Sequence, residues 1–139
     1  MNTLVDTSVW SLALRRKADD LSDSEALLVA ELTELVREGR ACMLGVIRQE
    51  LLSGIKTTEQ YEKLRLTLRA FPDESLRTSD YEAAAKASNA CRAKGIAVSV
   101  VDALICAMTI YRDWTIFTTD PDFRKYESVL PIKYHTPRK

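Results

Sequence analysis

The chain has 139 residues, of which 46% are hydrophobic, and its 20 basic and 20 acidic residues give a formal net charge of zero. This length and composition predict one globular domain over residues 1–139, and no apolar run approaches the roughly 20 residues that a membrane span needs. Because the charge is balanced, a nucleic-acid partner can be argued only from local patches. The N-terminal segment MNTLVDTSVW has no basic region followed by an apolar core, so we expect no secretory signal.

Short apolar segments alternate with helical patterns along the whole chain. In the first half, the patterns predict strands at 3–6 and 41–45 and helices at 7–17, 25–39, 46–55 and 57–71. In the second half, they predict helices at 79–95, 99–113 and 120–126 and strands at 74–78, 114–118 and 131–135. The strand at 74–78 is weak, and Pro131 marks the last strand as an edge strand. The alternation predicts an α/β domain with a parallel sheet of about five short strands and helices on both faces.

Cysteine and histidine usage argues against disulfides and zinc. The three cysteines, Cys42, Cys91 and Cys106, are far apart in apolar or alanine-rich segments, so we expect buried, reduced thiols in a cytoplasmic protein. No cysteine or histidine pair has the spacing of a zinc site. The single histidine, His135, lies in the polar tail YHTPRK, where we expect it to be solvated rather than catalytic.

Four acidic residues from distant segments are predicted to meet at one edge of the sheet. Asp6 ends the first strand, Asp120 follows the strand at 114–118, and Glu50 and Asp102 lie in the first turns of their helices. In an open parallel sheet, the ends of the strands and the starts of the following helices share the edge where ligands bind. We therefore expect the four carboxylates to line one cleft.

Each of these acids also has a purely structural explanation. Asp6 would cap the helix that follows it, and Asp102 completes the S-x-x-D capping pattern with Ser99. Asp120 followed by Pro121 is a typical helix start. Capping and a place in the cleft are compatible roles for the same side chain.

Glu50 could also lie on a solvated helix face, but it borders the apolar stripe of its helix. Asp102 is embedded in the apolar segment SVVDALICA. Half-buried carboxylates are costly unless they are paired or bind a metal. Since the sequence offers no histidine or zinc set, the expected partner is a hard divalent ion, Mg²⁺ or Mn²⁺, which takes carboxylate and water oxygens. Such an ion can activate water and stabilise the charge that builds on a phosphate during hydrolysis, as in nucleases.

The sequence resembles the PIN-domain ribonucleases, most closely the VapC-type toxins of bacterial or archaeal toxin–antitoxin pairs. The matching segments, LVDTSVW, VIRQELLSG, VVDALICA and TIFTTDPDF, run in this order from Leu4 to Phe123. Each segment alone is weakly specific, but the four in order in a lone domain of this size are strongly specific. The resemblance implies an Mg²⁺- or Mn²⁺-dependent endoribonuclease that works as a homodimer and is inhibited by a VapB-type antitoxin encoded beside it.

The resemblance also implies roles for individual residues. It carries over an acidic catalytic set of Asp6, Glu50, Asp102 and Asp120. The implied metal ligands are Asp6, Asp102, Asp120 and Asp122, the last at a position that is less uniformly acidic. Thr7, Ser8 and Thr118 match hydroxyl positions that support the metal or its water. Because residues two apart on a helix do not share a face, we expect Asp120 to bind the metal directly and Asp122 to take a second ligand position or contact metal-bound water.

Basic residues near predicted helix ends or the acidic edge are candidates for phosphate contacts. They are Arg15, Arg16, Lys17, Arg48, Lys56, Arg92 and Lys94. Arg48, two residues before Glu50, is the strongest candidate, for RNA or for an acidic antitoxin segment. Ordinary solvated surface charge remains the alternative for each of them.

Three other functions are compatible with parts of this pattern. A receiver-like phosphoacceptor also gathers acids around Mg²⁺, but here no acidic pair follows the first strand, and PIKYH poorly matches a lysine-bearing strand end. A non-catalytic PIN domain is disfavoured by the full acidic set. A housekeeping RNA-processing nuclease of the same fold stays open, although a lone domain mildly favours the toxin.

Overall fold

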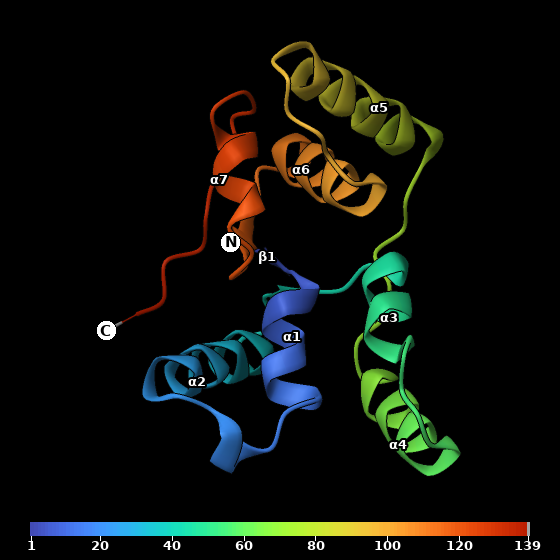
Figure 1. Cartoon of the computed structure of the whole chain (residues 1–139), viewed down its shortest axis with the longest axis vertical. Coiled ribbons are helices and arrows are strands. Elements are labelled where there is room, and N and C mark those ends of the chain that lie inside the picture. Colours follow the sequence, from blue (N-terminus) through green and yellow to red (C-terminus); the bar gives the residue numbers. More distant parts are fainter. Residues whose placement is uncertain (139) are drawn as a thin grey trace.

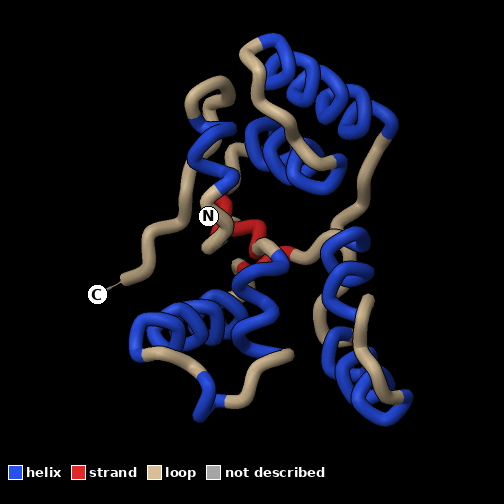
Figure 2. The backbone as a smooth tube through the Cα atoms, viewed as in Figure 1, coloured by secondary structure: helices blue, strands red, loops and turns tan. Residues whose placement is uncertain are grey.

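A three-stranded parallel sheet forms the centre of the computed structural model, which describes residues 1–138 (Figures 1 and 2). Its strands are β1 (Thr3–Val5), β2 (Ala41–Cys42) and β3 (Thr115–Phe117), in the order β2-β1-β3. Leu4 in the central strand pairs with Cys42 on one side and Ile116 on the other. Since all three strands run in the same direction, they end at one edge, where the acidic residues were expected.

Helices cover this sheet on both sides, as the sequence predicted. They are α1 (Thr7–Leu14), α2 (Asp23–Arg37), α3 (Gly45–Leu52), α4 (Thr58–Leu68), α5 (Thr78–Ala93), α6 (Val100–Arg112) and α7 (Asp122–Glu127), with a short 3₁₀ turn, η1 (Ala18–Asp20). Figure 1 shows α1 and α2 on one side of the strands and α5 and α6 on the other. The apolar sequence of α6 fits its place, because its residues 103–109 are all buried. None of the helices within residues 1–138 has the length and apolar character needed to cross a membrane.

The predicted strand at 74–78 is not present. Pairing beyond β2 is limited to one parallel bridge between Met43 and Asp73, with the Glu74 N–H donating to the Met43 carbonyl at 2.9 Å. Pro72, just before the bridge, has no N–H to extend the ladder. Beyond it, the chain turns to begin α5, where the Arg77 N–H donates to the Asp80 carboxylate.

The predicted edge strand at 131–135 is likewise reduced to a single bridge between Ile116 and Tyr134. The Ile116 N–H donates to the Lys133 carbonyl, and the His135 N–H donates to the Ile116 carbonyl, both at 2.8 Å. Pro137 then prevents a longer ladder on this edge. The predicted parallel sheet of about five strands therefore has three strands, and the two outer segments add one parallel bridge each.

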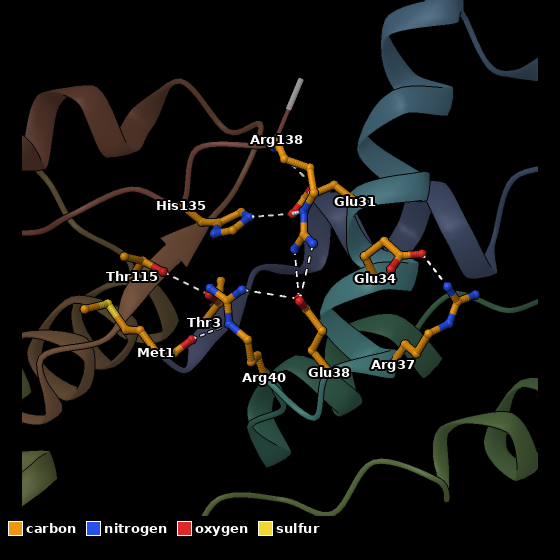
Figure 3. A network of polar contacts seen from close by, with 10 residues as sticks. All are labelled: Met1, Thr3, Glu31, Glu34, Arg37, Glu38, Arg40, Thr115, His135 and Arg138. Atoms are coloured by element: carbon orange, nitrogen blue, oxygen red, sulfur yellow. Dashed lines mark hydrogen bonds and ion pairs between the residues drawn. The ribbon is translucent and has the colours of Figure 1, made fainter.

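His135 is nearly buried, so the expectation of a solvated tail histidine is wrong. Its side chain is 9% exposed, and its Nε2 lies 3.0 Å from Oε1 of Glu31 in α2 (Figure 3). The ring also packs against Phe117, with 5.3 Å between the ring centroids. A polar tail sequence did not predict this burial, because the cause is an acidic side chain about a hundred residues away.

Glu31 anchors the tail through more than the histidine. It is 3% exposed, and it accepts hydrogen bonds from the backbone N–H and Nε of Arg138 at 3.2 and 3.0 Å. Burial raises the pKa of Glu31, but the bonds from His135 and Arg138 outweigh burial and leave that pKa below its usual value. Arg138 also pairs with Glu38 at 2.8 Å, and Glu38 contacts Arg40 at 3.3 Å (Figure 3). The network holds the tail beside β3.

The cysteines behave as predicted. Cys42, Cys91 and Cys106 are all buried and free. Burial raises the pKa of the Cys42 thiol to about 11, and it also raises the thiol pKa values of Cys91 and Cys106. All three are therefore inert core thiols at neutral pH.

Candidate metal centre

Asp6 lies between β1 and α1, where it caps the helix as predicted. Its Oδ2 accepts hydrogen bonds from the Ser8 hydroxyl and the Thr118 hydroxyl, each at 2.8 Å, and from the Ser8 N–H at 3.4 Å. The residue is 5% exposed. Within residues 1–138, no group donates to Oδ1, so the lone pairs of this oxygen are unused, and Asp6 lies outside the group formed by Asp102, Asp120 and Asp122.

The same two hydroxyls fix the loop after β3 beside the start of α1. The Ser8 hydroxyl accepts from the Thr119 N–H, and the Thr118 hydroxyl accepts from the Asp120 N–H, both at 3.0 Å. Ser8 and Thr118 are 110 positions apart in the sequence. They connect the ends of β1 and β3 and hold Asp6 and Asp120 at one edge of the sheet.

Asp102, Asp120 and Asp122 come together at this edge. One carboxylate oxygen from each lies within 4.8 Å of the other two. The Asp102 N–H donates to the Ser99 hydroxyl at 3.0 Å, as the capping pattern predicted. The Asp122 N–H donates to Asp120 Oδ1 at 2.9 Å, and the helix begins at Asp122 with Pro121 as its N-cap, so the prediction of Asp120 as the N-cap is wrong.

Asp102, one of these three aspartates, has a pKa that is shifted by its surroundings. Burial raises its pKa above the usual value, and the charges of Asp6 and Asp120 raise it further, while a hydrogen bond from Tyr126 opposes them. Crowded carboxylates of this kind favour either a shared proton or a bound cation. The possible metal ligands in this group are all carboxylate oxygens. Such a set suits Mg²⁺ or Mn²⁺ and lacks the nitrogen or sulfur ligands that zinc prefers.

Glu50 is exposed, so its predicted half-burial is wrong. The Thr7 hydroxyl donates to Glu50 Oε1 at 2.6 Å and holds the side chain across from the start of α1. Glu50 lines a cavity of about 460 Å³ together with Thr7, Gln49, Ser53 and Val101, the residue next to Asp102. Glu50 therefore faces the same edge as the aspartates but lies outside the group formed by Asp102, Asp120 and Asp122.

Arg48 points into the protein rather than toward a partner. Its Nε donates to Asp73 Oδ1 at 2.9 Å, and its Nη1 donates to the Leu68 carbonyl at 2.9 Å. Its Nη2 donates to the Phe71 carbonyl. The structure thus gives this arginine an internal role, tying α3 to the end of α4, in place of the RNA or antitoxin contact predicted for it.

Comparison with known proteins identifies the family. Residues 3–129 match the model of the PIN domain. The chain belongs to the PIN-domain family. This match confirms the resemblance inferred from the sequence motifs. No curated protein matches the chain significantly.

Solved structures share the fold of this PIN domain at low sequence identity. FitAcB from Neisseria gonorrhoeae superposes with a TM-score of 0.74 at 18% identity, over 97% of each chain. VapBC2 from Rickettsia felis, bound to a promoter DNA fragment, gives 0.75 at 16% identity, over 97% of this chain and 98% of that one. FitAB bound to the IR36 DNA fragment superposes with a TM-score of 0.72 at 19% identity, over 97% of this chain and 94% of that one.

Tyr126 contacts the candidate site, although the sequence analysis gave it no role. Its hydroxyl donates to Asp102 Oδ2 at 2.7 Å, and the residue is 2% exposed. Its ring packs edge-on against Phe123, with 5.2 Å between centroids. The available signal was its position four residues after Asp122, which puts both side chains on one face of α7.

Tyr126→Phe is expected to weaken Mn²⁺ binding by about 10- to 100-fold, the usual cost of losing a group that orients a metal ligand. The hydroxyl occupies Asp102 Oδ2, so Oδ1 is the oxygen that would be available to a cation, and phenylalanine keeps the ring contact with Phe123. Isothermal titration of Mn²⁺ measures the effect. Tyr111→Phe is the control, because Tyr111 is 74% exposed. Equal affinities for wild type and Tyr126→Phe would show that Asp102 needs no such support.

Proposed function

We propose that this PIN domain is an Mg²⁺- or Mn²⁺-dependent endoribonuclease that acts as the toxin of a VapBC-type toxin–antitoxin pair. The observation that carries the proposal is the convergence of Asp102, Asp120 and Asp122 within 4.8 Å at the carboxyl edge of a parallel sheet. Membership of a nuclease family supports hydrolysis of a phosphodiester bond. The likeness to FitAB and VapBC2, which share the fold, supports the toxin assignment.

Each acidic side chain has a role in this proposal. Asp102, Asp120 and Asp122 would hold the cation, with Asp6 contributing its unpaired Oδ1. The bound ion would polarise a water molecule and offset the negative charge that builds on the scissile phosphate. Glu50, held by the Thr7 hydroxyl and exposed at the cavity beside the aspartates, would accept the proton of the attacking water.

The partners follow from the same assignment. The substrate is RNA, and the inhibitor is a VapB-type antitoxin encoded beside this chain. We also propose a homodimer that works in the cytoplasm, where three buried free thiols would remain reduced. The complexes named FitAB and VapBC2, both solved with DNA, support an antitoxin partner.

The deciding experiment is RNA cleavage by the purified protein. Cleavage should appear with Mg²⁺ or Mn²⁺ and stop when EDTA is added, because the aspartates would then have no cation to share. Add-back of excess Mn²⁺ controls for irreversible damage by the chelator. Cleavage that continues in EDTA would rule out the metal mechanism, and the absence of any cleavage with either ion would rule out the nuclease.

A further inference from the structure

A groove of about 610 Å³ lies between the C-terminal end of α1 and α4. Its apolar part is formed by Ala13, Leu14, Ile55 and Leu64, which belong to both sides of the groove. Gly54 lines it where the chain passes from α3 to α4. The groove is therefore a separate concavity from the cavity beside Glu50.

The charge of this groove is of one sign. Basic side chains line it, namely Arg15, Arg16, Lys17, Lys56 and Lys63, and no acidic residue does. The guanidinium of Arg16 already has partners within the protein, because it lies 3.7 Å from the Glu25 carboxylate and donates to the Asp20 carbonyl. Within residues 1–138, the other four form no ion pair, and all four are exposed. For a chain with zero net charge, this is a marked local excess of cations.

The groove adjoins the proposed catalytic site. Helix α1 begins beside Asp6 at the acidic edge and ends at the groove, and its eight residues span about 12 Å. On the other side, Ser53 lines the cavity of Glu50, and the next residue, Gly54, lines the groove. Figure 1 shows α1 beside α3 and α4. An RNA strand with a phosphate at the aspartates would thus have a path along α1 and α3 into the basic groove.

We propose that this groove binds the RNA strand on one side of the scissile bond through its phosphates. The inference rests on the proposed function, since it identifies where the substrate of that site continues. A lining with several cations and no carboxylate fits a polyanion, and phosphate contacts set position without reading sequence. The lining contains no aromatic side chain on which a base would stack, so the contacts would be to the backbone.

The test is the binding of a 12-nucleotide single-stranded oligouridylate in EDTA, where no cleavage occurs. Lys63→Gln should bind the oligonucleotide about 5-fold more weakly than wild type at 0.1 M salt, and the double variant Lys56→Gln/Lys63→Gln about 25-fold more weakly. The reason is that each lost phosphate contact lowers the slope of log affinity against log salt concentration by about 0.7. Lys86→Gln is the matched control. Lys86 is also an exposed helical lysine without an ion pair in the described part of the chain, but it lies in α5, on the other side of the sheet.

The outcomes separate the groove from the nuclease. Equal affinities and salt slopes for wild type, Lys63→Gln and Lys86→Gln would overturn the groove assignment, as would a wild type that fails to bind the oligonucleotide. Unchanged RNA binding together with lost binding of the small protein encoded beside this chain would assign the groove to that protein instead. Because binding is measured in EDTA, a failure of cleavage does not affect this result.

Discussion

Asp6→Asn is expected to abolish metal-dependent RNA cleavage without unfolding the protein. Asparagine can keep its side-chain oxygen in the place of Oδ2, where it still accepts the hydrogen bonds from Ser8 and Thr118. The variant would then have an amide NH₂ in place of the unpaired Oδ1, the oxygen that Asp6 is proposed to contribute to the cation. The loss should exceed the roughly 100-fold that the removal of an indirect partner costs, because a direct charge is lost. Initial rates of RNA cleavage at saturating Mn²⁺ measure it.

The fold should survive this substitution, because the charge of Asp6 raises the pKa of the half-buried Asp102. Removing that charge relieves repulsion in the protein without a cation, so the thermal midpoint of Asp6→Asn should equal or exceed that of wild type. Asp19→Asn, at an exposed acid in η1, controls for a general effect of charge. A variant that cleaves RNA at the wild-type rate, or one that is inactive only because it unfolds, would contradict the role given to Asp6.

Expression of wild type and of Asp6→Asn in a bacterial host distinguishes a toxin from a housekeeping nuclease. Wild type expressed alone in a bacterial host should arrest growth, Asp6→Asn should not, and the small protein encoded beside this chain should restore growth to cells making wild type. Normal growth with a wild type that cleaves RNA in the test tube would favour an RNA-processing role. Both roles would use the same aspartates, so growth of the host is the measurement that separates them.

The convergence of acids was predictable from the sequence because it depends on local patterns. Short apolar strands followed by helices fix a parallel sheet, and each acid follows a strand or begins a helix. In the structure Asp102 and Asp120 share one group with Asp122, and Asp6, outside that group, is close enough for its charge to raise the pKa of Asp102. The capping bonds at Asp6 and Ser99 are the ones that the spacing indicated, whereas the N-cap of α7 is Pro121 rather than the predicted Asp120. The outer strands were overestimated, because propensity does not reveal how soon a proline or a helix start ends the pairing.

Four side chains were misjudged, and each is governed by a partner far away in the sequence. Arg48 binds Asp73 and two carbonyls at the C-terminal end of α4 and just beyond it, and His135 is buried against Glu31, 104 positions away. Tyr126 reaches Asp102 from α7. Glu50 is exposed and is held by the Thr7 hydroxyl, 43 positions away. A single sequence contains the side chains that these contacts need but not their pairing, so the hydrogen-bonding environment of the site required the structure.

Asp120→Asn is expected to reduce cleavage more than Asp122→Asn. Asp120 lies in the loop after β3, two residues beyond Thr118, whose hydroxyl fixes the Asp120 N–H, so its carboxylate is held toward Asp102. Asp122 is also within reach of Asp102, but its side chain is 52% exposed and lies 3.5 Å from the ammonium of Lys125. We therefore expect Asp122→Asn to cost about 10- to 100-fold and Asp120→Asn to cost more.

Titration of cleavage with Mn²⁺ distinguishes the two aspartates further. If Asp122 contributes mainly to cation affinity, raising the Mn²⁺ concentration should restore part of the activity of Asp122→Asn, whereas Asp120→Asn should stay inactive because a fixed ligand is missing. Lys125→Gln is the control for the neighbouring charge: it frees Asp122 from its ion pair and should bind Mn²⁺ at least as tightly as wild type. Equal losses without rescue would make both aspartates direct ligands. A larger loss at Asp122 would reverse the assignment and place the exposed carboxylate, rather than the one fixed by Thr118, at the centre of the site.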